Sequence, residues 1–190
     1  MARKPVSKKA SPDYDPSAYP PFAVTVDIAV FTRTERGLEV LLVKRGEAPF
    51  EGRWALPGGF VHDNESLDAA AARELKEETR IEGGGYLEQL GAYGDPGRDP
   101  RMRVVTACYV AVLPDLPEPE GGGDAAEAQL HPVARIEAGR LKLAFDHRAI
   151  FGDALEQVRG RLEDTPIATA FCGATFSLTE LRSVYEDIWG

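Results

Sequence analysis

The stretch that decides the fold of this 190-residue chain is GFVHDNESLDAAAARELKEETRI, residues 59–81. Apolar residues recur at helical spacing in its second part, with no glycine or proline between them, which predicts a helix over residues 67–81. On such a helix Glu74, Glu77 and Glu78 stand at positions i, i+3 and i+4 and share one face. Three carboxylates at such a short separation repel one another, so the cluster indicates either a bound cation or a solvated acidic face.

Two further features favour the cation. Carboxylate oxygens suit a hard divalent ion, above all Mg²⁺, with Mn²⁺ as the alternative. The glycines at positions 58 and 59 precede the helix and can bring backbone carbonyls against a metal or a phosphate. The spacing Gly-x5-Glu-x7-Arg-Glu-apolar-x-Glu-Glu is also long and specific enough to leave little room for chance.

This spacing resembles the signature of the Nudix hydrolases, Gly-x5-Glu-x7-Arg-Glu-U-x-Glu-Glu-x-Gly-U, in which U is a bulky aliphatic residue. The resemblance covers about residues 21–133. The chain departs from the signature at Arg80, where the family has glycine, but the glycines at 83–85 can end the helix slightly later. The matching positions are Gly59, Glu65, Arg73, Glu74, Leu75, Glu77, Glu78 and Ile81.

The resemblance implies a fold, a reaction and a site. The fold is α/β, an α/β/α sandwich around a mixed sheet, and the reaction is metal-dependent hydrolysis of a nucleoside diphosphate linked to another moiety. Arg73 and Glu65 would pair to hold the helix against its loop, and Glu74 would be the general base. The ligands of the metal would be the Gly58 carbonyl and the side chains of Glu74, Glu77 and Glu78.

Flanking segments narrow the resemblance to one branch of the family. Residues 98–101, 103–112 and 143–147 are similar to ADP-ribose pyrophosphatases and NAD-linked transcription regulators, in which a winged-helix module follows the Nudix domain. Arginine matches phosphate oxygens in pairs, so a set of four arginines is expected to contact the substrate. For the last three the alternative is an exposed loop charge, and the set consists of Arg53, Arg98, Arg101 and Arg103.

The pattern of strands and helices predicts three regions. Residues 1–20 form a flexible arm, residues 21–140 the Nudix domain, and residues 141–190 a small helical appendage that resembles part of a winged helix. Trp54 is expected in the core rather than as a platform for adenine, and His147 is expected as a structural residue at a helix start rather than a catalytic one. His62 and His131 have no partner pattern for catalysis and are also expected to be structural. Strands are expected at 22–32, 38–44, 52–61 (broken by Pro57), 86–93 and 103–113. A solvated linker or long loop is expected at 114–126. Helices are expected at 145–162 and 177–189, and the second of these begins with a capping box from Ser177 to Glu180.

Charge limits the partners. The chain has 22 basic and 31 acidic residues and a net charge of −9, which argues against a surface that grips nucleic acid or an anionic membrane. Residues 141–190 hold eight acidic and five basic side chains, a poor match to a DNA backbone, and we expect no nucleic-acid or membrane partner. A homodimer is an open alternative. Without a long apolar run or a secretory signal, a cytoplasmic location is expected.

Three functions remain to be weighed. The preferred one is hydrolysis of ADP-ribose, a small nucleotide-sugar, to AMP and ribose 5-phosphate. The second is an ADP-ribose-sensing transcriptional regulator of NAD metabolism, and the third is a housecleaning nucleotide pyrophosphatase. Regulators of this branch often carry a decayed signature, whereas this chain keeps every acidic position. The chain also ends where the recognition helix and wing of a regulator are expected, which favours the enzyme.

Overall fold

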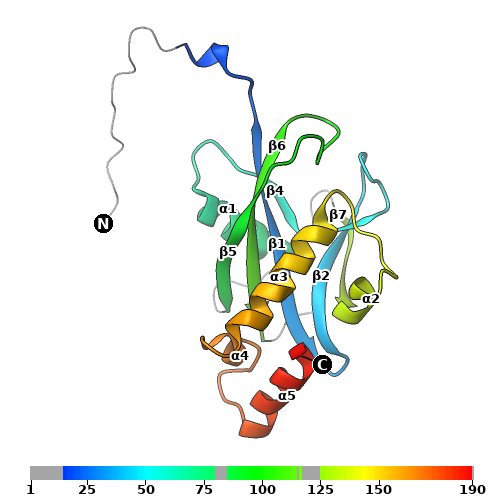
Figure 1. Cartoon of the computed structure of the whole chain (residues 1–190), viewed down its shortest axis with the longest axis vertical. Coiled ribbons are helices and arrows are strands. Elements are labelled where there is room, and N and C mark those ends of the chain that lie inside the picture. The colour runs from blue at the N-terminus through cyan, green and yellow to red at the C-terminus, as the bar shows by residue number, and fades with distance from the viewer. Residues whose placement is uncertain (1–14, 80–84, 115, 117–124, 190) are drawn as a thin grey trace, which may run out of the picture.

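A mixed β-sheet runs through the computed structural model, which describes residues 15–79, 85–114, 116 and 125–189 (Figure 1). Within those residues the sheet has seven strands in the order β3-β2-β1-β6-β5, with β4 paired to β1 and β7 paired to β2. Only β1 and β6 run parallel among these pairs. The strands are β1 (Ala23–Thr34), β2 (Gly37–Arg45), β3 (Trp54–Ala55), β4 (Gly58–Phe60), β5 (Tyr86–Tyr93), β6 (Val104–Leu113) and β7 (Ala125–Pro132).

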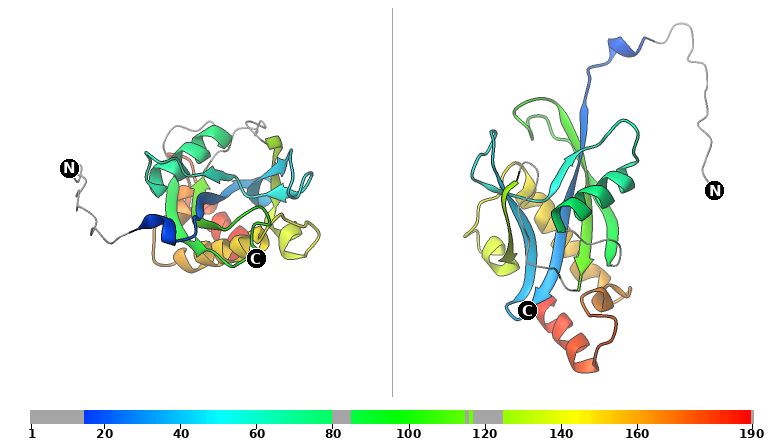
Figure 2. Two further views of the ribbon diagram at one scale, coloured as in Figure 1. Left: turned by 90° about the horizontal axis from the view of Figure 1, so that it is seen from above. Right: turned by 180° about the vertical axis from the view of Figure 1, so that it is seen from behind.

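Helices cover both faces of this sheet, which confirms the predicted sandwich. Figure 2 shows α1 on one face and α3 on the other. Alternate residues of β1 serve the two sides, since Ile28 packs in the cluster that includes α1 and Phe31 in the cluster that includes α3. The described helices are η1 (Pro16–Ala18), α1 (Leu67–Thr79), α2 (Val133–Glu137), α3 (His147–Arg161), α4 (Ile167–Ala170) and α5 (Leu178–Trp189).

The C-terminal helices share the hydrophobic core of the sheet. Phe151 of α3 is fully buried, and its ring centroid lies 6.1 Å from that of Phe31 in β1. Val184 and Ile188 of α5 belong to the same cluster. The core therefore does not break at residue 140, where the sequence suggests a boundary, and the division into regions stays a prediction.

Local patterns predicted most elements correctly. The capping box of α5 is confirmed: the Glu180 amide donates to Ser177 Oγ at 3.1 Å, and the Ser177 amide donates to the Glu180 carboxylate at 2.6 Å. Four elements were missed, namely η1, which lies in the predicted flexible arm, and β7, α2 and α4. The sequence of β7, AAEAQLHP, lacks the β-branched residues that mark a strand, and the two α-helices are no longer than five residues.

Some predictions fall where the structure gives no description. The flexible arm lies mostly in residues 1–14, the end of the predicted helix at 80–81 is outside the described residues, and so is most of the predicted linker at 114–126. Residues 125–126 of that linker belong to β7. In the described part of the chain, no helix has both the length and the apolar character that a membrane span needs.

Candidate active site

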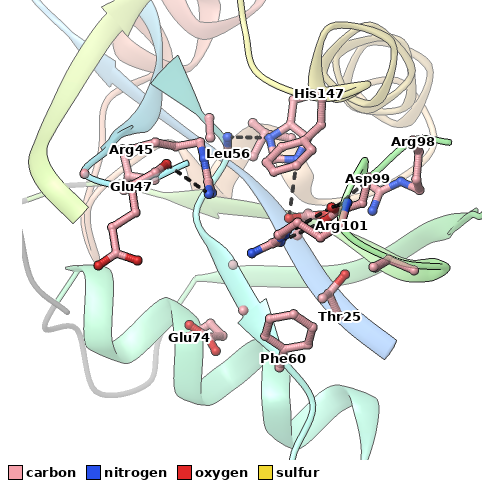
Figure 3. A pocket seen from close by; sticks show the side chains of 18 of the residues that line it. Thr25, Arg45, Glu47, Leu56, Phe60, Glu74, Arg98, Asp99, Arg101 and His147 are labelled. Atoms are coloured by element: carbon pink, nitrogen blue, oxygen red, sulfur yellow. Dashed lines mark hydrogen bonds and ion pairs between the residues drawn. The ribbon is translucent and has the colours of Figure 1, made fainter. Parts of the chain in front are cut away.

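A pocket of about 700 Å³ opens where the sheet, two loops and two helices meet (Figure 3). Its walls come from β1, from β2 and the loop after it, from β4, from α1, from the loop at 94–101 and from the start of α3. Both acidic and basic side chains line the pocket. Among the residues that line it are Thr25, Asp27, Arg45, Glu47, Leu56, Gly58, Gly59, Phe60, His62, Glu74, Glu77, Arg98, Asp99, Arg101, Phe145 and His147.

One wall of the pocket is formed by Gly59 and Glu74, which both match the Nudix signature. Glu74 lies against β4, and a Cβ atom on Gly59 would come within 2.3 Å of Glu74 Oε1, so the carboxylate needs a glycine at this place. Only 8% of Glu74 is exposed. Burial raises the pKa of Glu74, and the hydrogen bond from Arg73 opposes that rise. A raised pKa of a carboxyl next to a pocket is common at functional sites, and the role of Glu74 as general base stays a prediction.

Arg73 ties the helix to the loop before it. Its Nε and Nη2 donate to the two oxygens of Glu65 at 3.1 and 2.8 Å, and Nη2 also donates to the Phe60 carbonyl at 3.2 Å. The pairing of Arg73 with Glu65 that the resemblance implies is thus present. The Arg73 guanidinium and the His62 amide hold the pKa of Glu65 at about 2.

Replacing Glu65 with glutamine should remove a pH-dependent part of the stability. The pKa of Glu65 is lowered from 4.5 to about 2 in the folded chain, so its carboxyl binds fewer protons there than in the unfolded chain. Its stabilising effect is present above the unfolded pKa and is lost as the pH falls through the folded pKa. In urea unfolding, the advantage of the wild type over Glu65→Gln should shrink as the pH falls from about 4.5 toward about 2. An advantage that stays constant over that range would contradict this.

The donor set fits a hard divalent cation. Across the described ranges no three acidic, histidine or cysteine side chains gather closely enough to hold a metal by themselves, and the side chain of Glu78 lies outside the description. Mg²⁺ commonly uses only one or two carboxylates, with waters and substrate phosphates as its other ligands. Arg73 Nη1 lies 2.6 Å from Glu74 Oε1 and 3.4 Å from Glu77 Oε2, so one cationic group already bridges these two carboxylates.

The predicted arginines separate into two groups. Arg98 and Arg101 line the pocket, whereas Arg53 and Arg103 are not among its lining residues. Arg101 pairs with Asp99 at 2.7 Å. Arg53 lies over the Phe50 ring and Arg103 over the Phe22 ring, at 5.6 and 5.1 Å from the centroids. A role in substrate binding stays a prediction for all four.

The alternative of an exposed loop charge is wrong for Arg98. Its side chain is 4% exposed and donates to both oxygens of Asp146, at 2.8 and 2.7 Å. A longer contact of 3.4 Å joins it to Asp27 in β1. Two acids from different parts of the chain hold this arginine in place because a buried guanidinium needs charged partners.

This buried group of Asp27, Arg98, Asp146 and His147 was not predicted as a unit. The signal in the sequence was the Asp-His pair at the start of a predicted helix, but nothing local connects it to β1 or to residue 98. His147 is buried and accepts a hydrogen bond, which agrees with the structural role expected for it. Trp54 packs against the core and meets His131 with ring centroids 4.4 Å apart, also as expected.

Comparison with known proteins decides the family. The NUDIX domain family matches residues 21–153. The chain is a Nudix hydrolase. Enzymes of the Nudix family need divalent metal ions, in agreement with the carboxylates that Glu74 and Glu77 bring to the pocket. The Nudix match also extends past residue 140 into α3, as the shared core does.

Two relatives of this Nudix chain carry different functions in their names. The ADPR-responsive transcriptional repressor NtrR of Acinetobacter baylyi is 35% identical over 179 residues, which are 93% of this chain and 70% of the repressor. The ADP-ribose pyrophosphatase of Methanocaldococcus jannaschii is 36% identical over 137 residues, which are 70% of this chain and 75% of the enzyme. A solved MutT/nudix family protein from Enterococcus faecalis superposes with a TM-score of 0.80 at 33% identity, covering 90% of this chain and 75% of that protein.

Proposed function

We propose that this Nudix hydrolase cleaves the pyrophosphate bond of ADP-ribose to AMP and ribose 5-phosphate with Mg²⁺ as its metal. The observation that carries the proposal is the pocket in which Glu74 and Glu77 face a space that also holds Arg45 and Arg101. Figure 3 shows Arg45 and Arg101 entering from different walls, above the Glu74 carboxylate. The names of both relatives refer to ADP-ribose, which supports this substrate over other nucleoside diphosphate derivatives.

The residues divide the work as follows. Glu74, Glu77 and Glu78 would hold the cation together with the Gly58 carbonyl, and Glu74 would orient or deprotonate the attacking water. When bound, Mg²⁺ would neutralise charge on the phosphate oxygens and help to form the nucleophile near neutral pH. Arg101 is placed to pair with a phosphate, at the cost of loosening its bond to Asp99. Arg73 keeps the glutamates in register with the loop before the helix.

The decisive experiment is a substrate panel. Purified protein with Mg²⁺ or Mn²⁺ should convert ADP-ribose to AMP and ribose 5-phosphate, detected by chromatography of the products. NADH, other dinucleotides and oxidised nucleoside triphosphates serve as competing substrates, and the last of these tests the housecleaning alternative. If every compound in the panel is left uncleaved, the proposal is wrong.

Metal should also stabilise the folded chain in the absence of substrate. A ligand that binds only the folded state, at about 100 times its Kd, adds about 2.7 kcal/mol to the free energy of unfolding. Thermal unfolding in Mg²⁺ should therefore occur at a higher temperature than in EDTA. The same comparison with Glu77→Gln should show a smaller shift, because that variant lacks one of the carboxylates at the pocket. An equal shift in both proteins would place the cation elsewhere.

The second candidate is an ADP-ribose-sensing regulator, and one observation favours it. The repressor NtrR aligns with 93% of this chain. Residues 141–190 nevertheless hold more acidic than basic side chains, which does not suit a DNA backbone. A gel-shift with operator DNA from NAD-metabolism genes decides: specific binding by this chain would favour the regulator. A homodimer and a cytoplasmic location stay predictions.

A further inference from the structure

We propose that His147 is a positioning residue that holds the glycine turn of the metal site, defined as residues 56–59, from the start of α3. The inference rests on the proposed function, in which the Gly58 carbonyl and Glu74 form part of that site. Helix α3 then has a role in the geometry of the pocket and not only in the hydrophobic core.

The first support is a buried hydrogen bond between the turn and the helix. The Leu56 amide donates to His147 Nδ1 at 2.9 Å, and both residues are nearly inaccessible to solvent. On the next residue, the Pro57 carbonyl accepts from the Ile28 amide of β1 at 2.9 Å. The turn is thus held by β1 on one side and by α3 on the other, immediately before the glycine that lines the pocket.

The second support is the close packing of Asp27 against Gly58. Asp27 pairs with Gly58 across β1 and β4, and a Cβ on Gly58 would lie 2.9 Å from Asp27 Oδ1. The same oxygen is 3.6 Å from His147 Nε2. The imidazole therefore contacts the turn through one nitrogen and faces the residue behind the turn with the other, which restricts where the turn can lie.

The start of α3 is itself anchored. Arg98 forms a bidentate pair with Asp146, the residue before His147, and reaches Asp27 at 3.4 Å. Upstream, the Ala144 amide donates to the Trp54 carbonyl of β3 at 2.8 Å. An imidazole between two fixed segments can transmit their position to the turn. Burial lowers the pKa of His147, which keeps the ring neutral so that Nδ1 can accept the Leu56 proton.

Because groups behind metal ligands commonly change metal affinity or activity by about 10–100-fold when they are mutated, the effect should be measurable. The test compares His147→Leu, which has no acceptor, with His147→Asn, whose Oδ1 can take the place of Nδ1. Mn²⁺ affinity is measured by electron paramagnetic resonance without substrate, and kcat and KM for ADP-ribose are measured separately. We expect His147→Leu to lose about tenfold or more in Mn²⁺ affinity and in kcat, with KM less affected, and His147→Asn to keep most of both.

A matched control separates position from stability. Leu155→Ala removes a buried side chain eight residues further along the same helix and leaves the hydrogen bond between Leu56 and His147 in place, so it should lower the unfolding temperature and leave Mn²⁺ affinity unchanged. If His147→Leu behaves like Leu155→Ala, losing stability but not affinity, the inference is overturned. If His147→Leu does not fold, His147→Gln replaces it, because its longer side chain places polar atoms near Nε2 rather than Nδ1. Equal Mn²⁺ affinities in the Asn and Gln variants would then overturn the inference.

The outcomes also separate this inference from the proposed function. A wild type that binds Mn²⁺ but leaves ADP-ribose intact removes the proposed substrate, while the contrast between the Leu and Asn variants in Mn²⁺ affinity still decides the role of His147. A wild type that cleaves ADP-ribose, with unchanged affinity and kcat in His147→Leu, keeps the function and removes the inference.

Discussion

We expect the exchange of Glu74 for glutamine to lower kcat for the proposed substrate ADP-ribose by about 10³-fold, because metal-assisted charge stabilisation contributes several kcal/mol to such reactions. Glutamine matches the shape of the side chain and loses its charge. The carboxylate lies in the pocket wall against Gly59. Steady-state kinetics at saturating Mg²⁺ measures the loss.

The fold should survive this exchange. Burial raises the pKa of Glu74, which means that its site disfavours the charged form, and the neutral amide avoids that cost. Arg73 keeps its bonds to Glu65 and to the Phe60 carbonyl. Urea unfolding should therefore show a small change only. Glu186→Gln, an exposed exchange on α5, is the control that should leave both kcat and stability unchanged. Full activity of Glu74→Gln would mean that this carboxylate is neither ligand nor base.

Exchanging Gly58 for alanine lowers the free energy of unfolding by about 3 kcal/mol, the upper range for forced overpacking and backbone strain. The new Cβ would lie 2.1 Å from the Val26 carbonyl oxygen. That oxygen belongs to the backbone of the central strand β1, so it cannot swing aside as a side chain can. The pairing of β1 with β4 must loosen, and the glycine turn must shift with it.

Gly52→Ala is the matched control for this effect. Gly52 also has a positive φ, of 73°, but no atom lies within 4 Å of the position of its Cβ. Its exchange adds backbone strain without a clash and should cost about 1 kcal/mol. Chemical denaturation of both variants measures the difference. If the two variants were equally stable, the clash with Val26 would not be the source of the strain.

Local patterns were enough to predict much of this fold. The helical spacing of residues 67–81 located α1 and its acidic face, and the resemblance to the Nudix signature implied the pairing of Arg73 with Glu65. All of these residues lie within one loop and the helix that follows it. Alternation and turn residues located the long strands, and Ser177 with Glu180 marked the start of α5. These patterns depend only on residues that are close in the chain, so they predict helices and strands without knowledge of how those elements pack together.

Other features depended on distance in the chain. The Leu56 amide and His147 are 91 residues apart, and Arg98 and Asp27 are 71 residues apart. The strand β7 exists because β2 offers it hydrogen-bond partners, since its own residues have little preference for extended structure. Arg98 looks like a loop charge in the sequence and is buried only because two acids from other segments neutralise it.

The sequence by itself determined the family, the acidic helix and the reaction class. The reason is that the glycine, arginine and glutamates of the motif lie at fixed spacing within one loop and one helix. Only the tertiary structure decided which other segments line the pocket beside that helix. Packing of α3 on the sheet brings Asp146 and His147 close to the glycine turn, and Arg98 of the loop at 94–101 pairs with Asp146. These contacts depend on core burial and on charge pairing between remote segments. The spacing of the glutamates predicted a cation site, but it could not show that a histidine at the start of α3 contacts the turn beside that site.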